Sequence, residues 1–286
     1  MQYFDDKVVL VTGAGSGLGL SIVNELLRES QCTIIASGRS EARLKELFGN
    51  YEAVKVCCID LEWDDAKLAS CVEHTFKAHG AIDILINCAG LGFRGFVQET
   101  SAVVDRKVMQ VDYFGQVTII KAVIASAKRR QRCNLHIIQI SSVQGYFGLG
   151  ERAPYSAAKH ALVGFIDSLR AEVDSLESDS PVVVSLVSPG YIATNHSCNA
   201  LRGDGSIYSQ NDDTTADGWS AEHTAKCILR ASAGRKREIF LAEKKISFLI
   251  IIRYIFPMLC FRLLKNHSKK TKDATWKVIL KWLFGL

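Results

Sequence analysis

The sequence predicts an α/β fold of the doubly wound, Rossmann type, with helices on both faces of a parallel sheet. Short apolar, β-branched runs alternate with helical patterns from residue 7 to about 240, and a glycine-rich turn follows the first run. The length of 286 residues, with 48% hydrophobic residues and 4 Pro, suits one large packed domain with an appendage. Ligands of such sheets bind at the carboxyl ends of the strands, so we expect the chemistry there.

The predicted strands lie near residues 7–11, 32–36, 54–58, 83–86, 135–140, 182–187 and 237–241. The first core strand begins at Lys7 without a charged and apolar leader before it, so no secretory signal is expected. We expect residues 1–245 to form a dinucleotide-binding domain and residues 246–286 a separate tail. Segment 195–219, rich in Gly, Ser, Asn and Asp, is predicted to be a substrate lid, with a disordered insertion as the alternative.

A glycine-rich turn joins the first strand to the following helix. Its residues are Thr12, Gly13, Ala14, Gly15, Ser16, Gly17, Leu18 and Gly19. Backbone N–H groups and the helix dipole meet there, and missing Cβ atoms allow close approach, so the turn predicts a phosphate-binding site. The pattern is T-G-x-x-x-G-x-G, because Leu20 stands where the general G-x-G-x-x-G fingerprint has its third glycine. A tight turn without a ligand is the alternative.

The second strand ends at Arg39 and Ser40, where a chain specific for NAD is expected to carry an acidic residue for the ribose 2′-hydroxyl. The Arg39 guanidinium and the Ser40 hydroxyl can instead hold a 2′-phosphate by charge-assisted hydrogen bonds. We therefore expect NADP(H) as the cofactor in preference to NAD(H). The alternative is that Arg39 is a solvated residue that opens the next helix.

Ser142, Tyr155 and Lys159 are predicted to be catalytic. Tyr155 and Lys159 are four residues apart, so a helix that carries both places them on one face. The ammonium favours the phenolate and lowers a tyrosine pKa that is ordinarily about 10, which lets Tyr155 exchange a proton with a substrate oxygen. Ser142 follows the fifth strand and would hold the same oxygen. An exposed Tyr and Lys without a role are the alternative for this spacing alone.

Together these motifs resemble the short-chain dehydrogenase/reductase family over nearly all of residues 5–245. The resemblance implies hydride transfer between a nicotinamide dinucleotide and a carbonyl or alcohol carbon. It implies that Lys159 also binds the nicotinamide ribose, and that Ser142 is a better candidate than Ser141. It further implies cofactor contacts at an adenine-binding strand end, at an N-N-A-G turn with Cys in place of the second Asn, and at a P-G-x-x-x-T turn: Asp60, Leu61, Asn87, Ala89, Gly90, Pro189, Gly190, Ile192 and Thr194.

Asp112 departs from the family pattern, which expects Asn at this position. In the family that Asn helps to hold the water of a proton relay that leads from the lysine. A carboxylate adds a negative charge beside Lys159 and lacks the amide donor. We therefore count Asp112 among the catalytic positions and expect a weakened or altered proton relay.

The charge is unevenly divided. The chain carries +5 in total, yet segment 235–286 holds 13 Lys and Arg against 3 Asp and Glu. A basic segment at one end, beside long apolar runs, fits an anionic membrane surface better than nucleic acid. The 9 Cys show no CxxC spacing and no Cys/His cluster, so we expect a reducing compartment and no metal site, and we assign no cysteine a reactive role.

The tail begins with a largely apolar stretch of 19 residues, 246–264, which as a helix would span nearly a bilayer core. Arg253 and Pro257 lie near its middle, so a flat, interfacial or hairpin insertion is expected rather than a clean crossing. A later stretch repeats helical apolar spacing at Trp276, Ile279, Leu280 and Leu283. The alternatives are an extra core helix or a protein–protein surface, as in a homodimer or homotetramer.

The tail and the order of the motifs resemble a membrane-associated branch of the family, that of the dehydrogenase/reductase SDR family member 7 proteins and the microsomal 11-beta-hydroxysteroid dehydrogenases. The branch implies an apolar steroid, retinoid or lipid-like substrate. We expect attachment to the endoplasmic reticulum, with the catalytic domain in a reducing, cytosolic compartment as the cysteines indicate, or a cytoplasmic protein if the tail is no anchor. Residues after strand ends that could wall an apolar pocket are Phe93, Phe96, Tyr146, Phe147, Leu149 and Tyr191.

The sequence thus predicts an NADP(H)-dependent oxidoreductase on a membrane surface. The alternative is a dinucleotide-binding regulatory or scaffold protein with weak or vestigial catalysis, and Asp112 is the residue that favours it.

Overall fold

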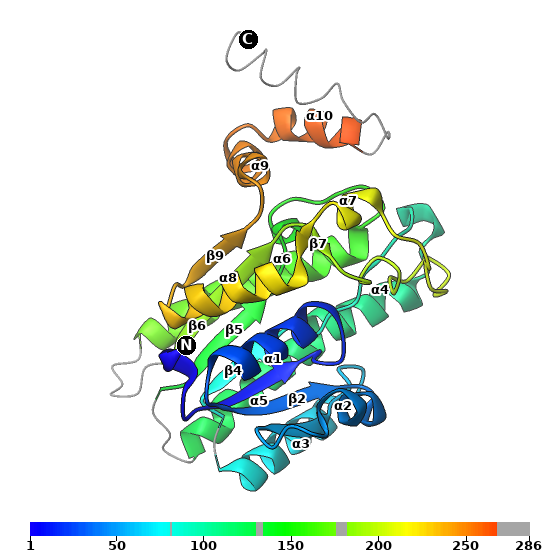
Figure 1. Ribbon diagram of the computed structural model, residues 1–286. Helices are drawn as coiled ribbons and strands as arrows, with labels where there is room; N and C mark the ends of the chain where they lie inside the picture. The colour runs from blue at the N-terminus through cyan, green and yellow to red at the C-terminus, as the bar shows by residue number, and fades with distance from the viewer. Residues whose placement is uncertain (81, 130–133, 176–181, 268–286) are drawn as a thin grey trace.

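The computed structural model describes residues 1–80, 82–129, 134–175 and 182–267, and a seven-stranded parallel sheet lies at its centre (Figure 1). The strand order is β3-β2-β1-β4-β5-β6-β9, so the winding reverses between β1 and β4, where a doubly wound sheet opens its ligand crevice. The strands are β1 (Val8–Thr12), β2 (Thr33–Gly38), β3 (Val54–Cys58), β4 (Ile84–Asn87), β5 (His136–Ile140), β6 (Val183–Pro189) and β9 (Glu238–Leu241). The predicted fold class is confirmed, and each strand lies within two residues of its predicted bounds.

Two layers of helices cover the sheet. On one face α1 (Gly17–Glu29), α2 (Glu41–Phe48) and α8 (Ala221–Ala233) enclose one apolar cluster; on the other α3 (Asp65–His79), α5 (Gly115–Arg129) and α6 (Ala153–Ser175) enclose a second. The central strands are buried on both faces, so Val9, Leu10 and Val11 are all 0% exposed. This double burial explains the continuous apolar runs in the sequence, because no face alternates with solvent.

Side-chain caps fix several helix starts near the functional edge of the sheet. The Ser40 hydroxyl accepts a hydrogen bond from the Arg43 N–H at 3.2 Å and begins α2. The Asp64 carboxylate does the same for α3, and Ser220 does so for α8. Each cap satisfies a backbone donor that the helix leaves free, so the residue that begins the helix is well defined.

A continuous helical stretch runs from α4 (Ala102–Met109) through the π-helical segment η3 (Gln110–Phe114) into α5. Within the described ranges this stretch, 102–129, is long and apolar enough to cross a membrane, but 44% of its most apolar window is buried inside the protein. Ile119 and Ile120 are fully buried against the sheet, as in a core helix. The π turn places Asp112 inside the protein at 0% exposure.

The segment predicted to be a lid is more ordered than the sequence indicates. It contains the short helix α7 (Asp213–Ala216). The parallel pair β7 (Ile192–Ala193) and β8 (Trp219–Ser220) joins the residues just before the segment to its last residue. The buried Arg94 guanidinium, from the loop after β4, donates to Asp212 Oδ2 at 2.6 Å and to Ser197 Oγ at 2.8 Å. These contacts hold the segment over the carboxyl edge of the sheet, and its action as a lid stays a prediction.

The apolar part of the tail forms two short helices, α9 (Lys244–Ile255) and α10 (Pro257–His267), which lie beyond the carboxyl edge of the sheet and run in different directions (Figure 1). We call these two helices the α9–α10 helix pair. The helix breaks before Pro257, which has no N–H to continue it and is well suited to the first position of the next helix. Leu249 and Ile252 pack against Val143 and Phe147. The apolar stretch is thus divided into two helices at Pro257, and its mode of membrane insertion stays a prediction. The stretch 276–283 lies outside the described residues.

Candidate active site

A cleft of about 760 Å³ follows the carboxyl edge of the sheet. The predicted catalytic residues Ser142, Tyr155 and Lys159 line it at one end. The predicted cofactor residues that line it are Thr12, Gly13, Gly15, Ser16, Gly17, Leu18, Gly19, Arg39, Ser40, Asp60, Leu61, Ala89, Gly90, Pro189, Gly190, Ile192 and Thr194. The fold thus gathers residues from six separate strand ends into one site.

The glycine turn has the geometry of a phosphate cradle. A Cβ on Gly13 would lie 2.8 Å from Ala89 Cα, and one on Gly19 would lie 2.3 Å from the Gly13 oxygen. Gly13 and Gly17 also have φ of +72° and +51°, in the left-handed region. These positions require glycine, and the helix N-terminus behind them offers free N–H groups to an anion, so the residues fit a dinucleotide pyrophosphate.

A buried amide network supports the cradle from below. Thr12 Oγ1 donates to Asn87 Oδ1 at 2.9 Å and accepts from the Ala89 N–H at 3.1 Å. Asn87 Nδ2 in turn donates to Gln139 Oε1 at 2.9 Å, and Gln139 Nε2 donates to Gln116 Oε1 at 2.6 Å. Asn87 is fully buried and does not line the cleft, so the structure places it as a support for the turn.

The far end of the cleft is basic. Arg39 is 71% exposed and lies 4.0 Å from Glu62, so it makes no tight ion pair there. Ser40 beside it caps α2, and Arg43, one turn into that helix, also lines the cleft. The sequence reasoning missed Arg43, although its position three residues after a helix-capping serine could have indicated it. Arg39, Ser40 and Arg43 thus all line this end of the cleft, and the Arg43 guanidinium also donates to Glu46 Oε2 at 2.8 Å.

Helix α6 carries Tyr155 and Lys159 on the face toward the cleft, with Lys159 Nζ 5.4 Å from the centre of the Tyr155 ring. Ser142 follows β5, and its hydrogen bond to Tyr155 lowers the pKa of the phenol. The Lys159 ammonium also lowers that pKa, as predicted, but burial has the larger effect and raises the pKa of Tyr155 above its ordinary value. The expected net lowering is thus not found in the chain itself, because desolvation of the phenolate outweighs the neighbouring charge.

Asp112 lies behind the cleft wall, where Oδ1 accepts from the Leu91 N–H at 2.7 Å and lies 4.0 Å from Lys159 Nζ. Burial raises the pKa of Asp112 to about 6, against the lowering effects of Lys159 and the Leu91 N–H. Oδ2 is buried without a hydrogen-bond partner among the described residues. The carboxyl can therefore hold or release a proton close to Lys159 near neutral pH.

The turn after β6 completes the wall opposite the glycine turn. Thr194 packs against Gly17, where a Cβ would meet its Cγ2 at 3.5 Å. Its hydroxyl accepts from the His196 N–H at 3.3 Å, and the His196 ring stands 5.9 Å from the Tyr155 ring. Surrounding protein and the nearby cations Lys159 and Arg94 lower the pKa of His196, so the imidazole is neutral at neutral pH. The sequence reasoning missed His196, which carries no motif.

The substrate end differs from the predicted apolar pocket. Of the six residues predicted to wall it, Tyr191 alone lines the cleft in the described part of the chain. Phe93 is fully buried in a cluster with Val104 and Leu201. The other four are exposed or pack elsewhere: Phe96, Tyr146, Phe147 and Leu149. The prediction was wrong for these five, because residues that follow strand ends can turn into satellite clusters as easily as into a cleft.

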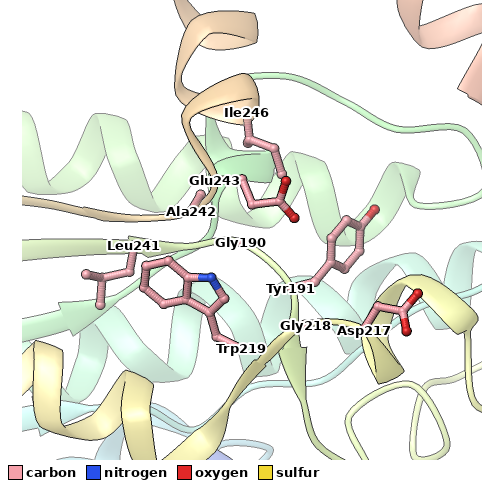
Figure 2. Close-up of a pocket in the computed structure, with 9 residues that line it drawn as sticks. All are labelled: Gly190, Tyr191, Asp217, Gly218, Trp219, Leu241, Ala242, Glu243 and Ile246. Atoms are coloured by element: carbon pink, nitrogen blue, oxygen red, sulfur yellow. The ribbon is translucent and has the colours of Figure 1, made fainter. Parts of the chain in front are cut away.

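A smaller cavity of about 120 Å³ adjoins the turn after β6 (Figure 2). It is lined by Tyr191 before the lid segment, by Trp219 at the end of that segment, and by Glu243 and Ile246 at the start of α9. Figure 2 shows the Tyr191 and Trp219 rings on opposite sides of Gly190. The start of the α9–α10 helix pair thus lies beside the same turn that borders the main cleft.

No group of three or more His, Cys, Asp or Glu side chains is placed to hold a metal ion within the ranges that the structure describes.

The short chain dehydrogenase family matches residues 7–203 of the chain. The sequence is 37% identical over 274 residues to Dehydrogenase/reductase SDR family member 7B of Danio rerio, which covers 93% of this chain and 86% of that protein. It is 38% identical over 285 residues to Dehydrogenase/reductase SDR family protein 7-like of Drosophila melanogaster, covering 95% and 83%.

Solved structures agree in fold. A short chain dehydrogenase/reductase from Burkholderia phymatum in complex with NAD has a TM-score of 0.75 at 21% identity, covering 91% of this chain and 96% of its own. A short chain dehydrogenase from Burkholderia cenocepacia J2315 in complex with NADP has a TM-score of 0.71 at 22% identity, covering 94% and 99%.

The chain therefore belongs to the short-chain dehydrogenase/reductase family, which supports oxidoreductase activity with a nicotinamide dinucleotide. Within this family it is similar to the member 7B and 7-like proteins, so the resemblance to the member 7 branch is confirmed.

Proposed function

We propose that the protein is an NADP(H)-dependent oxidoreductase that moves a hydride between the nicotinamide and a carbonyl or alcohol carbon. The observation that carries the proposal is the meeting of Ser142, Tyr155 and Lys159 in one cleft with the glycine cradle. A bound dinucleotide supplies or accepts the hydride. The side chains of this chain supply the proton and hold the substrate oxygen.

The roles of the three residues follow from their surroundings. Burial keeps the Tyr155 phenol protonated at neutral pH, which is the form that donates a proton to a carbonyl oxygen during reduction. Ser142, within hydrogen-bond reach of Tyr155, holds the same oxygen as negative charge develops on it. Lys159 stabilises the phenolate that remains, and Asp112 behind it takes part in reprotonation. An oxidation would use the same groups in reverse.

NADP(H) rather than NAD(H) is proposed because Arg39, Ser40 and Arg43 line the adenosine end of the cleft. The test is a titration of NADPH and NADH against wild type and Arg39→Asp. We expect wild type to bind NADPH more tightly and the variant to lose most of that preference, since a carboxylate repels the 2′-phosphate. Lys45→Asp, on the exposed side of α2, controls for charge reversal. An unchanged preference in Arg39→Asp would refute this assignment.

An apolar, lipid-borne substrate is proposed because the α9–α10 helix pair exposes apolar side chains near the cleft. Its exposed apolar side chains are Phe248, Ile251, Tyr254, Ile255, Phe256, Met258 and Phe261. A surface of this kind exceeds what isolated apolar residues on a soluble protein present. A panel of steroid, retinoid and lipid carbonyls, assayed by NADPH consumption, tests the proposal. Faster turnover of short water-soluble carbonyls than of every lipid carbonyl would contradict it.

Membrane attachment through 246–286 is proposed on the same surface, with the endoplasmic reticulum and a cytosol-facing catalytic domain as the setting. Lys244 and Lys245 at the start of the α9–α10 helix pair add attraction to anionic lipid. We expect wild type to co-sediment with vesicles of phosphatidylcholine and phosphatidylserine, and Ile255→Asp with Met258→Asp to remain in solution. Val103→Asp, at an exposed apolar site on α4, is the control. Equal sedimentation of all three proteins would rule out the α9–α10 helix pair as the anchor.

A regulatory or scaffold role with vestigial catalysis is a second candidate, and the charge of Asp112 beside Lys159 favours it. The two functions differ in one measurement. An NADPH-consuming activity that Tyr155→Phe abolishes supports the enzyme, whereas a wild type that binds NADPH but is inert toward the whole panel supports the scaffold. A homodimer or homotetramer stays a prediction.

A further inference from the structure

Two cysteines that are far apart in the sequence meet beside the adenosine end of the cleft. Cys57 lies near the end of β3 and Cys71 in the second turn of α3, and their Sγ atoms are 3.8 Å apart. Both are free thiols that are partly exposed to solvent. The sequence assigned no cysteine a reactive role because no close spacing pairs them, and it is the packing of α3 on the sheet that brings the sulfurs into contact.

The surroundings of the pair suit thiol chemistry. A hydrogen bond from Cys71 to the Cys57 sulfur lowers the pKa of Cys57 to about 7, against the effect of burial. Thr75 Oγ1 donates to the Cys71 carbonyl at 2.9 Å and lies 3.6 Å from Cys57 Sγ, so it helps to hold the two sulfurs in place. A thiolate next to a second thiol is the arrangement found in redox-sensitive proteins, because the second thiol traps the oxidised first one.

The pair is connected to the cofactor residues through the backbone. Cys57 and Cys58 pair in register with Ser37 and Gly38 at the end of β2, directly before Arg39. Cys58 Sγ donates to the Arg39 carbonyl at 3.4 Å. The connection from Cys57 to Cys71 also carries the adenosine wall of the cleft at residues 60 and 61. A movement of β3 against α3 therefore reaches both sides of the adenosine site.

We propose that Cys57 and Cys71 are a peroxide-sensitive thiol pair that closes to an intrachain disulfide and thereby weakens dinucleotide binding. The Cys57 thiolate attacks a hydroperoxide, so that the O–O bond breaks and sulfenic acid forms with release of hydroxide. Cys71 then attacks that sulfur; an S–S bond forms, and the hydroxyl leaves as water with the thiol proton. One hydroperoxide is reduced by two electrons and both thiols are oxidised by one electron each.

Closure changes the geometry of the cofactor site. The sulfurs must approach from 3.8 Å to about 2 Å, which draws the first turns of α3 toward the end of β3. The connection that carries Asp60 and Leu61 must follow, because it joins the two linked elements. The binding consequence rests on the proposed function, since it assumes that a dinucleotide occupies this end of the cleft.

The disulfide is tested by peptide mapping of the full chain without reduction, after treatment with stoichiometric hydrogen peroxide. We expect a linked peptide pair that contains Cys57 and Cys71 in wild type and equally in Cys58→Ser, whose thiol faces Arg39. In Cys71→Ser the linkage is lost, and dimedone traps sulfenic acid at Cys57. Absence of the linkage from wild type, or preferential linkage of Cys57 to another cysteine, would overturn the proposal.

The effect on binding is tested by NADPH titration of reduced, peroxide-treated and re-reduced protein. We expect a severalfold weaker affinity in the disulfide form, full recovery with dithiothreitol, and no peroxide effect in Cys57→Ser. A disulfide form that binds NADPH as tightly as the reduced form would overturn the coupling to the cofactor. Failure of the reduced protein to bind any dinucleotide would instead contradict the proposed function, and the mapping result would still decide the thiol pair.

Discussion

Strand β5 has polar residues at both ends, and the two ends differ in how their hydrogen bonds are satisfied. At the amino end His136 is 2% exposed, and its two ring nitrogens lie 2.8 Å from Tyr3 Oη and 2.8 Å from Ser185 Oγ. Beyond the carboxyl end, Ser141 Oγ is buried without a partner among the described residues, while Ser142 lines the cleft. We call the amino end of β5 the closed end, because its polar groups are hydrogen-bonded to one another. We call the carboxyl end the open end, because its polar groups face the cleft.

The comparison shows that a shifted pKa does not by itself mark a functional site. Burial lowers the pKa of His136 to about 4, and it also lowers the pKa of His196 in the cleft. Both ring nitrogens of His136 have hydrogen-bond partners. Ser185 Oγ donates to the Lys236 carbonyl at 2.6 Å, so it keeps a lone pair that can accept from the imidazole N–H. His196 and Tyr155 face a cleft instead. Open hydrogen-bonding capacity separates the groups that act on a ligand from those that stabilise the fold.

Replacement of Tyr155 should give the largest effect at the open end. We expect Tyr155→Phe to lower kcat by about 10²- to 10⁴-fold, because the variant lacks the hydroxyl that exchanges the proton with the substrate oxygen. NADPH affinity should change little, since the ring remains in place. Steady-state kinetics and a separate NADPH titration check this. A variant that retains most of its kcat would show that another group transfers the proton.

At the closed end, His136 should make stability fall with acid. Its folded pKa of about 4 lies below the unfolded value near 6.5, so its stabilising effect is complete above pH 6.5 and is lost as pH falls toward 4. The loss amounts to about 3 kcal/mol. Urea unfolding of wild type and His136→Gln between pH 7 and 4.5 measures it. We expect a shallower pH dependence in the variant, and parallel curves would contradict the assignment.

The cradle at the open end depends on backbone shape rather than on titration. Gly19→Ala should weaken NADPH binding by about tenfold or more, because the new Cβ would lie 2.3 Å from the Gly13 carbonyl and push the turn away from the phosphate. Gly164→Ala, in α6 with nothing within 4 Å of its Cβ, is the matched control and should bind normally. Equal NADPH affinities in the two variants would show that the turn accommodates the extra Cβ without loss of binding.

The residues at and around the open end differ in how far the sequence predicts them. The glycine turn and the Tyr155–Lys159 pair are local patterns whose spacing fixes their geometry, so both were located from the sequence. The contacts of Asn87 with Gln116 and Gln139 join residues up to 52 positions apart. The burial of Phe93 and the meeting of Cys57 with Cys71 likewise depend on packing between elements. No local period encodes such contacts, which is why the support of the site and its substrate wall were missed or misplaced.

Replacement of Asp112 should change the rate least among these variants. It tests whether the charge of this carboxylate sets the pKa of Tyr155 at the open end. The pKa of Asp112 is about 6, so the carboxyl is ionised above that pH, where its charge raises the pKa of Tyr155. Asp112→Asn removes the charge and keeps the hydrogen-bonding size of the side chain. We expect the alkaline limb of the oxidation rate to move to lower pH, with a change in rate of less than about tenfold at neutral pH.

The pH profile separates this role from a structural one. Wild type should show a step in kcat/KM near pH 6 that disappears in Asp112→Asn, since the variant has no carboxyl to titrate. Asp105→Asn, an exposed carboxyl on the preceding helix, controls for loss of a negative charge at a distance. If wild type and Asp112→Asn give the same profile, the carboxyl does not reach the proton path, and the open end of β5 is governed by Ser142, Tyr155 and Lys159 alone.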